Sequence, residues 1–455
     1  MSTFVKRRNH AVRDLVPRLT DEHPALGLID LDLIDERAQE LKRIFQSSRR
    51  VLHTIAAKAT PLRAVLAEYA RLGFGCEVAS PGELGLAVAT GFPPENIVFD
   101  SPAKTSSSLK KAFELGVNIN FDNFDEVARF DEILDHHGTN PATGIGLRIN
   151  PQLDSGTIAS TSTATKVSKF GVGLRDQNAR DRIIETYLDR PWMNQIHIHS
   201  GSQGMSLYQA AEGIQAVVEL TEDINRLSLE QHGKTRITTI DIGGGLPVSY
   251  DSDDLTPDYS DYHDVLVKTV PQLFEYELIT EFGRSLTAKA GAIFARVEHV
   301  KKTGGRRIAI THAGVHIVTR TAYMPDDWQL RVFALNPDGR EKQTPEIPHD
   351  IAGPACFSGD LVAQERMLPR LDSGDTILVP DTGAYCFTSH YSYNMLPQVP
   401  VVGYRETSEA TLAYSLLRPA QTVDDLLAET GPQTPIPLSE DRFDYADCSR
   451  NVSTL

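Results

Sequence analysis

Few cysteines and a shortage of basic residues limit what this 455-residue chain can be. The four cysteines, Cys76, Cys356, Cys386 and Cys448, include no C-x-x-C pair, so the sequence indicates neither a disulfide framework nor a zinc site, and we expect no bound metal. Lysine and arginine total 45 against 61 aspartates and glutamates, a formal net charge of −16. Nucleic acids and anionic membrane surfaces would repel such a chain, so neither is an expected partner.

Long hydrophobic runs are also missing. No apolar stretch is long enough to cross a bilayer, and the basic N-terminus MSTFVKRRNHAVRDL lacks the apolar core of a secretory signal. We therefore expect a soluble protein of a reducing compartment, most simply the cytoplasm. The 40% of hydrophobic residues is enough for a sizeable core, and the length fits two domains.

Short apolar strands alternate with helix-like stretches through the middle of the chain. Most of the strands are apolar on both faces, as strands buried between helices are. Eight are predicted, at residues 51–57, 75–80, 96–100, 117–122, 144–150, 195–200, 238–243 and 278–282. Helices are expected between them, from near residues 61, 81, 105, 124, 176, 206 and 258. This alternation implies a parallel sheet, and its length favours a closed (β/α)8 barrel of about 250 residues over a doubly wound open sheet.

The sequence changes character after residue 285. Strand-like segments follow one another there without intervening helices, which predicts a C-terminal, mainly β domain over residues 286–420. The barrel is expected to span residues 46–285. Residues 1–45 fit neither pattern and are expected to pack with the β domain, and residues 421–455, rich in Pro, Thr, Asp and Glu, are expected to form a loosely ordered tail.

Reactive residues gather at the predicted carboxyl ends of the strands, where barrel enzymes place their active sites. Each alone is weak evidence, because a lysine at a strand end is usually a solvated charge and a run of glycines often marks only a tight turn. Their coincidence at one end of the barrel favours a site. They are Lys58, Arg148, His199, Gly243, Gly244, Gly245, Glu281 and Arg284.

The last two strands predict a phosphate site. The three glycines at 243–245 would let backbone N–H groups approach an anion, and Arg284 would add a bidentate contact. Lys58 lies in the apolar segment LHTIAAKA, where burial should lower its pKa and favour the neutral amine. A neutral lysine facing a phosphate cradle is what an aldehyde cofactor needs in order to form a Schiff base.

Eight motifs, in this order, resemble those of the alanine-racemase-like, or fold-type III, pyridoxal-phosphate enzymes. The closer resemblance is to their ornithine/diaminopimelate/arginine decarboxylase branch. The motifs are HTIAAKATPLRAV, GCEVASPGEL, SKFGVG, HIHSGS, IDIGGGLPV, EFGRS, GPACFSGD and DTGAY. The resemblance implies pyridoxal 5'-phosphate as the cofactor, a small-molecule amino acid as the substrate and decarboxylation as the reaction.

The resemblance also implies a role for each matching residue. Lys58 would form the Schiff base, Glu281 would keep the pyridine nitrogen protonated so that the ring withdraws electrons, and His199 would stack on the ring. Glu77 and Arg148 would line the cofactor pocket. The phosphate would be held by Ser202, Gly243, Gly244, Gly245, Arg284 and Tyr385.

A homodimer with shared active sites is a further implication. Cys356, delivered from a second subunit, would protonate the carbanionic carbon after carbon dioxide leaves, and Lys169 and Asp360 resemble an ion pair across the dimer interface. Judged by residue type alone, Cys356 would more often be a buried thiol without a catalytic role.

Two departures from the family pattern concern the substrate. Relatives that act on basic amino acids carry an acidic residue directly after the cysteine, whereas this chain has Phe357, and a phenyl ring does not offset the desolvation of an ammonium. We therefore expect a substrate that is not a simple lysine- or ornithine-type cation. Arg320 and Tyr323 match the pair that grips a distal carboxylate in the diaminopimelate branch, with a spacing one residue shorter, and Asp326 or Asp327 could instead contact a substrate amine.

Decarboxylation of an amino acid is the leading hypothesis. A racemase or epimerase on the same scaffold is the second, although racemases of this fold carry an arginine where this chain has Glu281. A decarboxylase-like regulator without a cofactor is the third, and the retention of Lys58, His199, Arg284 and Cys356 argues against it.

Overall fold

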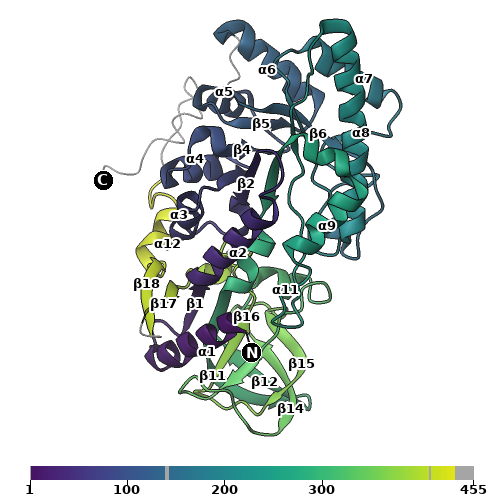
Figure 1. Cartoon of the computed structure of the whole chain (residues 1–455). Helices are drawn as coiled ribbons and strands as arrows, with labels where there is room; N and C mark the ends of the chain where they lie inside the picture. The colour runs from purple at the N-terminus through teal and green to yellow at the C-terminus, as the bar shows by residue number, and fades with distance from the viewer. Residues whose placement is uncertain (1, 139–142, 409–410, 436–455) are drawn as a thin grey trace.

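The structure is a computed structural model that describes residues 2–138, 143–408 and 411–435. Eight parallel strands form a closed barrel in the order β5-β4-β3-β2-β10-β9-β8-β6, and β6 pairs with β5 to complete the ring. The barrel occupies the upper part of the molecule in Figure 1. The predicted barrel is thus confirmed, and the open sheet is excluded. The strands are β2 (Val51–Ala56), β3 (Gly75–Val78), β4 (Ile97–Phe99), β5 (Asn118–Phe121), β6 (Ile145–Asn150), β8 (Gln195–His197), β9 (Thr239–Asp241) and β10 (Glu277–Phe282).

Seven helices connect these strands, and local sequence signals set their ends. Ser80 accepts the N–H of Glu83 through its side chain, Pro81 occupies the first turn, and Gly91 ends this helix at a φ of 96°. The helices are α3 (Arg63–Arg71), α4 (Pro81–Thr90), α5 (Ser106–Leu115), α6 (Phe124–His137), α7 (Ala179–Asp189), α8 (Leu207–His232) and α9 (Tyr259–Thr269). A two-residue strand, β7 (Val172–Gly173), extends the sheet beside β6.

The ring of helices is completed from the N-terminal side. The helix after β10, α10 (Arg284–Thr287), has only four residues, and α2 (Leu31–Ile44) lies against α9 and α3. Asp30 caps α2 by accepting two backbone N–H groups of its first turn. Helix α2 belongs to the N-terminal segment, residues 1–45, that the sequence predicts to pack with the β domain, and this part of the segment covers the barrel.

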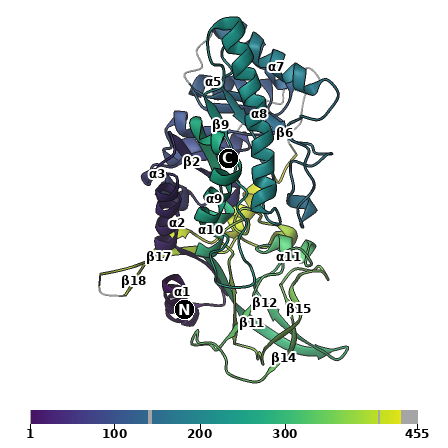
Figure 2. The ribbon, with the colours of Figure 1, turned by 45° about the vertical axis from the view of Figure 1, so that its right-hand side comes forward.

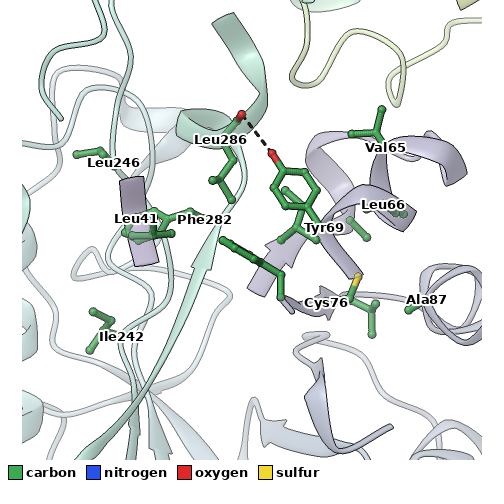
Figure 3. Close-up of a cluster of buried hydrophobic side chains, with 14 of the residues drawn as sticks. Leu41, Val65, Leu66, Tyr69, Cys76, Ala87, Ile242, Leu246, Phe282 and Leu286 are labelled. Carbon is green, nitrogen blue, oxygen red and sulfur yellow. Dashed lines mark hydrogen bonds between the residues drawn. The ribbon is translucent and has the colours of Figure 1, made fainter. Parts of the chain in front are cut away.

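The core beneath α2 joins it to the barrel strands. Leu41 of α2 packs in one buried cluster with Tyr69 of α3 and Phe282 of β10 (Figure 3). The hydroxyl of Tyr69 donates to the carbonyl of Leu286 at 3.2 Å, so the one polar atom of this buried ring is satisfied.

The remaining strands form a second sheet next to the barrel (Figure 2). Its order is β15-β14-β12-β11-β1-β17-β18, and β16 joins β13 to β11. β1 pairs antiparallel with β11 and parallel with β17, so the N-terminal strand lies inside this sheet. The strands are β1 (Ala25–Asp30), β11 (Gly291–Thr303), β12 (Arg306–Thr311), β13 (Phe333–Leu335), β14 (Glu346–Ala352), β15 (Leu361–Pro369), β16 (Thr376–Pro380), β17 (Val401–Glu406) and β18 (Leu412–Arg418).

The described chain has three further helices: α1 (Thr3–Leu15), α11 (Thr319–Tyr323) and α12 (Val423–Glu429). α12 lies in the segment expected to be a loose tail, and residues 436–455 of that tail lie outside the described residues. The domain boundaries at residues 45, 285 and 420 stay a prediction. In the part of the chain that the structure describes, no helix has the length and apolar character needed to cross a membrane.

A buried ion pair links the loop that follows β4 to the first turn of α6. Nζ of Lys104 lies 2.7 Å from Oε2 of Glu126, and the two side chains are 0% and 4% exposed. The same carboxylate accepts the backbone N–H groups of Lys104 and Asp122, each at 2.9 Å. The loop after β4 and the start of α6, which follows β5, both lie at the carboxyl ends of barrel strands, so this pair organises the mouth of the barrel.

Replacing Lys104 with methionine should destabilise the protein strongly, because Glu126 would remain buried without its cation. Losses of this kind cost about 3–5 kcal/mol. The matched control is Lys110→Met, which removes the exposed partner of Glu114 and should change the free energy of unfolding by less than about 1 kcal/mol. Urea unfolding followed by circular dichroism compares the two variants. Equal losses in the free energy of unfolding would mean that the buried ion pair stabilises the protein no more than the exposed one.

Candidate active site

Adjacent barrel strands bring the predicted cofactor residues to one end of the barrel. Lys58 follows β2, Glu77 lies in β3, and Glu281 lies in β10. β2 is hydrogen-bonded to β3 on one side and to β10 on the other. Arg148 in β6 and His199 just after β8 come from the opposite part of the ring.

Lys58 is held by acidic groups from the neighbouring strands. Its Nζ donates to Oε1 of Glu77 at 2.6 Å, and the Glu77 side chain is 0% exposed. Burial alone would lower the pKa of Lys58, but the carboxylates of Glu77 and Glu281 outweigh it and the pKa is raised. The prediction of a neutral amine is therefore wrong for the protein alone, because it considered the apolar strand of Lys58 and not the acids on the strands beside it.

Charged groups continue through the buried ends of the other strands. Oε2 of Glu281 lies 3.6 Å from Nε2 of His197 and 4.0 Å from Nδ1 of His199. Nδ1 of His197 lies 3.5 Å from Oδ1 of Asp100, and Nη1 of Arg148 donates to the other oxygen of Asp100 at 3.2 Å. His197 and Asp100 were not predicted as site residues. The one available signal was that His197 shares a strand face with His199.

His199 is the neutral member of this group. The N–H of Gly244 donates to its Nδ1 at 3.1 Å. Burial, helped by the nearby Arg148, lowers the pKa of His199 to about 3, so the imidazole carries no charge at neutral pH. A neutral ring fixed by a backbone N–H is suited to stacking on a flat aromatic ligand.

The glycine run forms a tight backbone cradle. A Cβ on Gly244 would lie 2.2 Å from the carbonyl oxygen of Glu281, and one on Gly245 would lie 2.3 Å from the carbonyl oxygen of Gly201. Gly243 and Gly245 also have φ values of 66° and 107°, which favour glycine. Side chains are thus excluded from this loop, so a phosphate could approach its backbone closely. Of the three glycines, Gly243 and Gly244 already donate their N–H groups to Asp241 and His199, which leaves the N–H of Gly245 to meet a phosphate.

Arg284 extends the cradle from the start of α10. Its Nε donates to Oγ of Ser202 at 3.3 Å, and its Nη1 donates to the hydroxyl of Tyr250 at 2.8 Å. The guanidinium lies over the ring of Tyr385, 4.6 Å from the centroid, and the backbone N–H of Tyr385 donates to the carbonyl of Ala59 beside Lys58. The structure therefore brings the predicted phosphate residues together with the lysine segment.

A second guanidinium, that of Arg320 in α11, lies on the same tyrosine. It is 4.3 Å from the ring centroid of Tyr385 and 5.0 Å from that of Trp328, and it lines one pocket with Arg284. Its Nη1 is buried without a hydrogen-bond partner, and the groups with the largest effect on its charge, Arg284, Tyr385, Tyr250 and Cys386, include no carboxylate. Burial and the neighbouring positive charge of Arg284 lower the pKa of Arg320. Because two guanidinium groups lie close together here, an anion bound in this pocket would be stabilised by both.

Cys356 lies on an exposed loop of the second half of the chain. Its backbone N–H donates to Oδ1 of Asn394 at 2.6 Å. Its neighbour Phe357 stacks on Tyr323 with 5.4 Å between the ring centroids. Helix α11 therefore connects this loop to the anion pocket, because it carries both Tyr323 and Arg320.

Asp360 stabilises the cysteine loop, residues 353–360, which contains Cys356 and joins β14 to β15. It is 3% exposed, and its carboxylate accepts the backbone N–H groups of Val315 and Ala355. Nothing in the sequence marked this role. Nζ of Lys169 lies over the ring of Phe170, 4.9 Å from its centroid, and the ion pair of Lys169 with Asp360 across a dimer stays a prediction.

Comparisons with known proteins agree with this geometry. Residues 31–288 match the family model described as pyridoxal-dependent decarboxylase, pyridoxal binding domain. The chain is 30% identical over 400 residues to diaminopimelate decarboxylase of Zymomonas mobilis, covering 87% of this chain and 90% of that protein. It is 33% identical over 348 residues to the enzyme of the same name from Vibrio cholerae, covering 76% and 79%. The crystal structure of Helicobacter pylori diaminopimelate decarboxylase complexed with L-lysine superposes with a TM-score of 0.78 at 27% identity, covering 90% of this chain and 97% of that one.

Replacing Glu77 with glutamine should speed the covalent capture of pyridoxal phosphate by Lys58 near neutral pH. The pKa of Lys58 would fall, and below that pKa the neutral amine fraction rises about tenfold per pH unit. The capture rate of the wild type should therefore rise steeply with pH. For the variant, the curve of capture rate against pH should be shifted to lower pH. Stopped-flow absorbance measures both curves. Glu83→Gln changes an acid that instead accepts the N–H of Ala79 and should leave the curve in place; an unshifted curve for Glu77→Gln would refute the assignment.

Proposed function

The chain belongs to the fold-type III family of pyridoxal-phosphate-dependent decarboxylases, and on that premise we propose that its substrate is an amino acid with a second carboxylate at its distal end. Pyridoxal phosphate is the cofactor, and removal of a carboxylate from an amino acid is the reaction. The observation that carries the proposal is the pair of guanidiniums, Arg284 and Arg320, that lie on Tyr385.

The residues at the barrel mouth fit this cofactor. Lys58 would bind its aldehyde group covalently, and the glycine loop, Ser202 and Arg284 would hold its phosphate. Glu281 would pair with its ring nitrogen, since both carboxylate oxygens are buried without a hydrogen-bond partner. When bound, the cofactor supplies the electron sink that stabilises the negative charge left at the α-carbon.

Two further side chains would control protons at the reacting atoms. Glu77, at 2.6 Å from Nζ of Lys58, would hold the amine in its protonated form and so set the pH above which the amine reacts. The thiol of Cys356 would return a proton to the α-carbon after the carboxylate leaves. His199 would stack on the cofactor ring, and Arg148 would line the cofactor pocket beside Asp100.

The substrate class follows from charge. With Arg284 assigned to the phosphate, the buried guanidinium of Arg320 remains for a second anion, and a bidentate carboxylate suits it. Phe357 provides no charge to offset an ammonium at its position. Diaminopimelate, the substrate that the relatives' names give, has a carboxylate at each end and is the first candidate. A diacid without a distal amine is the second.

We also propose that two copies of the chain share their active sites. Cys356 is exposed in the single chain. Beside it, the rings of Tyr323 and Phe357 stack on each other, and Tyr391 and Tyr393 form a second stacked pair that meets Tyr323 edge-on. Aromatic clusters of this kind are typical of interface cores, and burying this one against a second copy would place Cys356 in the partner's active site.

The purified protein, supplied with pyridoxal phosphate, should release carbon dioxide from diaminopimelate faster than from lysine or ornithine. Lys58→Arg should lose both this release and the visible absorbance of the bound cofactor, because arginine keeps the charge but does not bind the aldehyde. Trapping of labelled carbon dioxide across an amino-acid panel measures the first result. Exchange of the α-hydrogen without release of carbon dioxide would favour a racemase instead.

Replacing Phe357 with glutamate should raise kcat/KM for lysine at least about tenfold, because a carboxylate would then face the distal ammonium; this corresponds to about 1.4 kcal/mol. The measurement is kcat/KM for lysine, ornithine and diaminopimelate. Phe357→Gln is the matched control, since it is polar and uncharged and should produce no such gain. If Phe357→Glu improves none of the three substrates, the residue after the cysteine does not select the substrate.

A further inference from the structure

His197 is a second histidine of strand β8, two residues before the one that would stack on the cofactor. It is 0% exposed. Its Nδ1 lies 3.5 Å from Oδ1 of Asp100, and its Nε2 lies 3.6 Å from Oε2 of Glu281. A single imidazole thus lies between two carboxylates that come from different parts of the barrel.

The charges around His197 come from six barrel strands or their ends. Asp100 follows β4 and is paired with Arg148 of β6. Asp241 of β9 is satisfied separately, because its oxygens accept the N–H of Gly243 at 3.0 Å and the amide of Asn120 at 2.9 Å. Lys58 contacts Glu77 rather than the histidine, and His199 is neutral. The direct neighbours of His197 are therefore anionic.

These neighbours decide the protonation state of His197. Burial would lower its pKa, but the carboxylates of Asp100, Asp241 and Glu281 raise it to about 9, so the ring is an imidazolium at neutral pH. In return, burial would raise the pKa of Glu281, but His197 together with Lys58 lowers it. A buried carboxylate without a cation would otherwise take up a proton.

We propose that His197 is a positioning residue for the cofactor, which bridges Asp100 and Glu281 as an imidazolium and keeps Glu281 ionised and aligned for the pyridine nitrogen. Arg148, Asp100, His197 and Glu281 then form one chain of alternating charge that ends at the ring nitrogen. A neutral Glu281 would not hold that nitrogen protonated, and the ring would withdraw electrons less strongly. The inference rests on the proposed pairing of Glu281 with the cofactor.

His53 shows what a purely structural histidine looks like in the same barrel. It is 7% exposed in β2, next to β10. Its Nδ1 is hydrogen-bonded to Oγ1 of Thr280 at 2.8 Å, and burial lowers its pKa to about 4. It is therefore neutral and has an ordinary hydrogen-bond partner, whereas His197 has charged groups on both sides.

The test compares pyridoxal phosphate with its 1-deaza analogue, in which carbon replaces the ring nitrogen. Dissociation constants for both are measured by equilibrium dialysis on the full chain stripped of cofactor. His197→Gln keeps size and polarity without charge, and it should reduce the preference for pyridoxal phosphate over the analogue at least about tenfold. His53→Gln is the matched control and should leave the preference unchanged. A general loss of folding weakens both ligands equally and cancels in the ratio.

Two further variants make the outcome decisive. Asp100→Asn removes the anion on the other side of the imidazole and should shift the ratio in the same direction as His197→Gln. Glu281→Gln should reduce the ratio most. If Glu281→Gln reduces it and the His197 and Asp100 variants do not, the role of His197 is overturned while the proposed function stands. If Glu281→Gln leaves it unchanged, the pairing of Glu281 with the ring nitrogen fails, and the inference fails with it.

Discussion

Three buried carboxylates at the mouth of one barrel, those of Glu77, Asp100 and Glu281, are the constraint on which the rest of the site depends. Isolated ionised carboxylates are unstable away from water, so each needs a cation. Lys58 meets Glu77, Arg148 meets Asp100, and His197 lies between Asp100 and Glu281. The same pairings keep the lysine protonated and keep Glu281 available for a cationic partner.

The other side of the mouth has the opposite character. The glycine loop allows close approach to its backbone, and the guanidiniums of Arg284 and Arg320 both lie over the ring of Tyr385. A ligand with a cationic ring nitrogen and an anionic phosphate fits between these two regions in one orientation. The charge separation therefore explains how the site would orient pyridoxal phosphate before any chemistry occurs.

The second sheet contributes to the site and does more than support the barrel. Arg320, Tyr385 and the loop of Cys356 all follow β10 in the chain, and Asp360 fixes that loop through backbone hydrogen bonds. Helix α11 links the anion pocket to the aromatic rings beside Cys356. Residues proposed for substrate selection and for proton return thus come from one compact region outside the barrel.

The sequence by itself determined the eight strands, the start of α4 at Ser80 and the cradle of Gly243, Gly244 and Gly245, because hydrophobic pattern, capping and glycine content are local signals. It also placed Lys58 and Glu281 at strand ends. It did not determine that α2 covers the barrel, that Asp360 organises the cysteine loop, or that Lys58 is protonated beside Glu77. Only the tertiary structure decided these, because each depends on groups far apart in the chain, and a charge responds to the neighbours that folding brings near it.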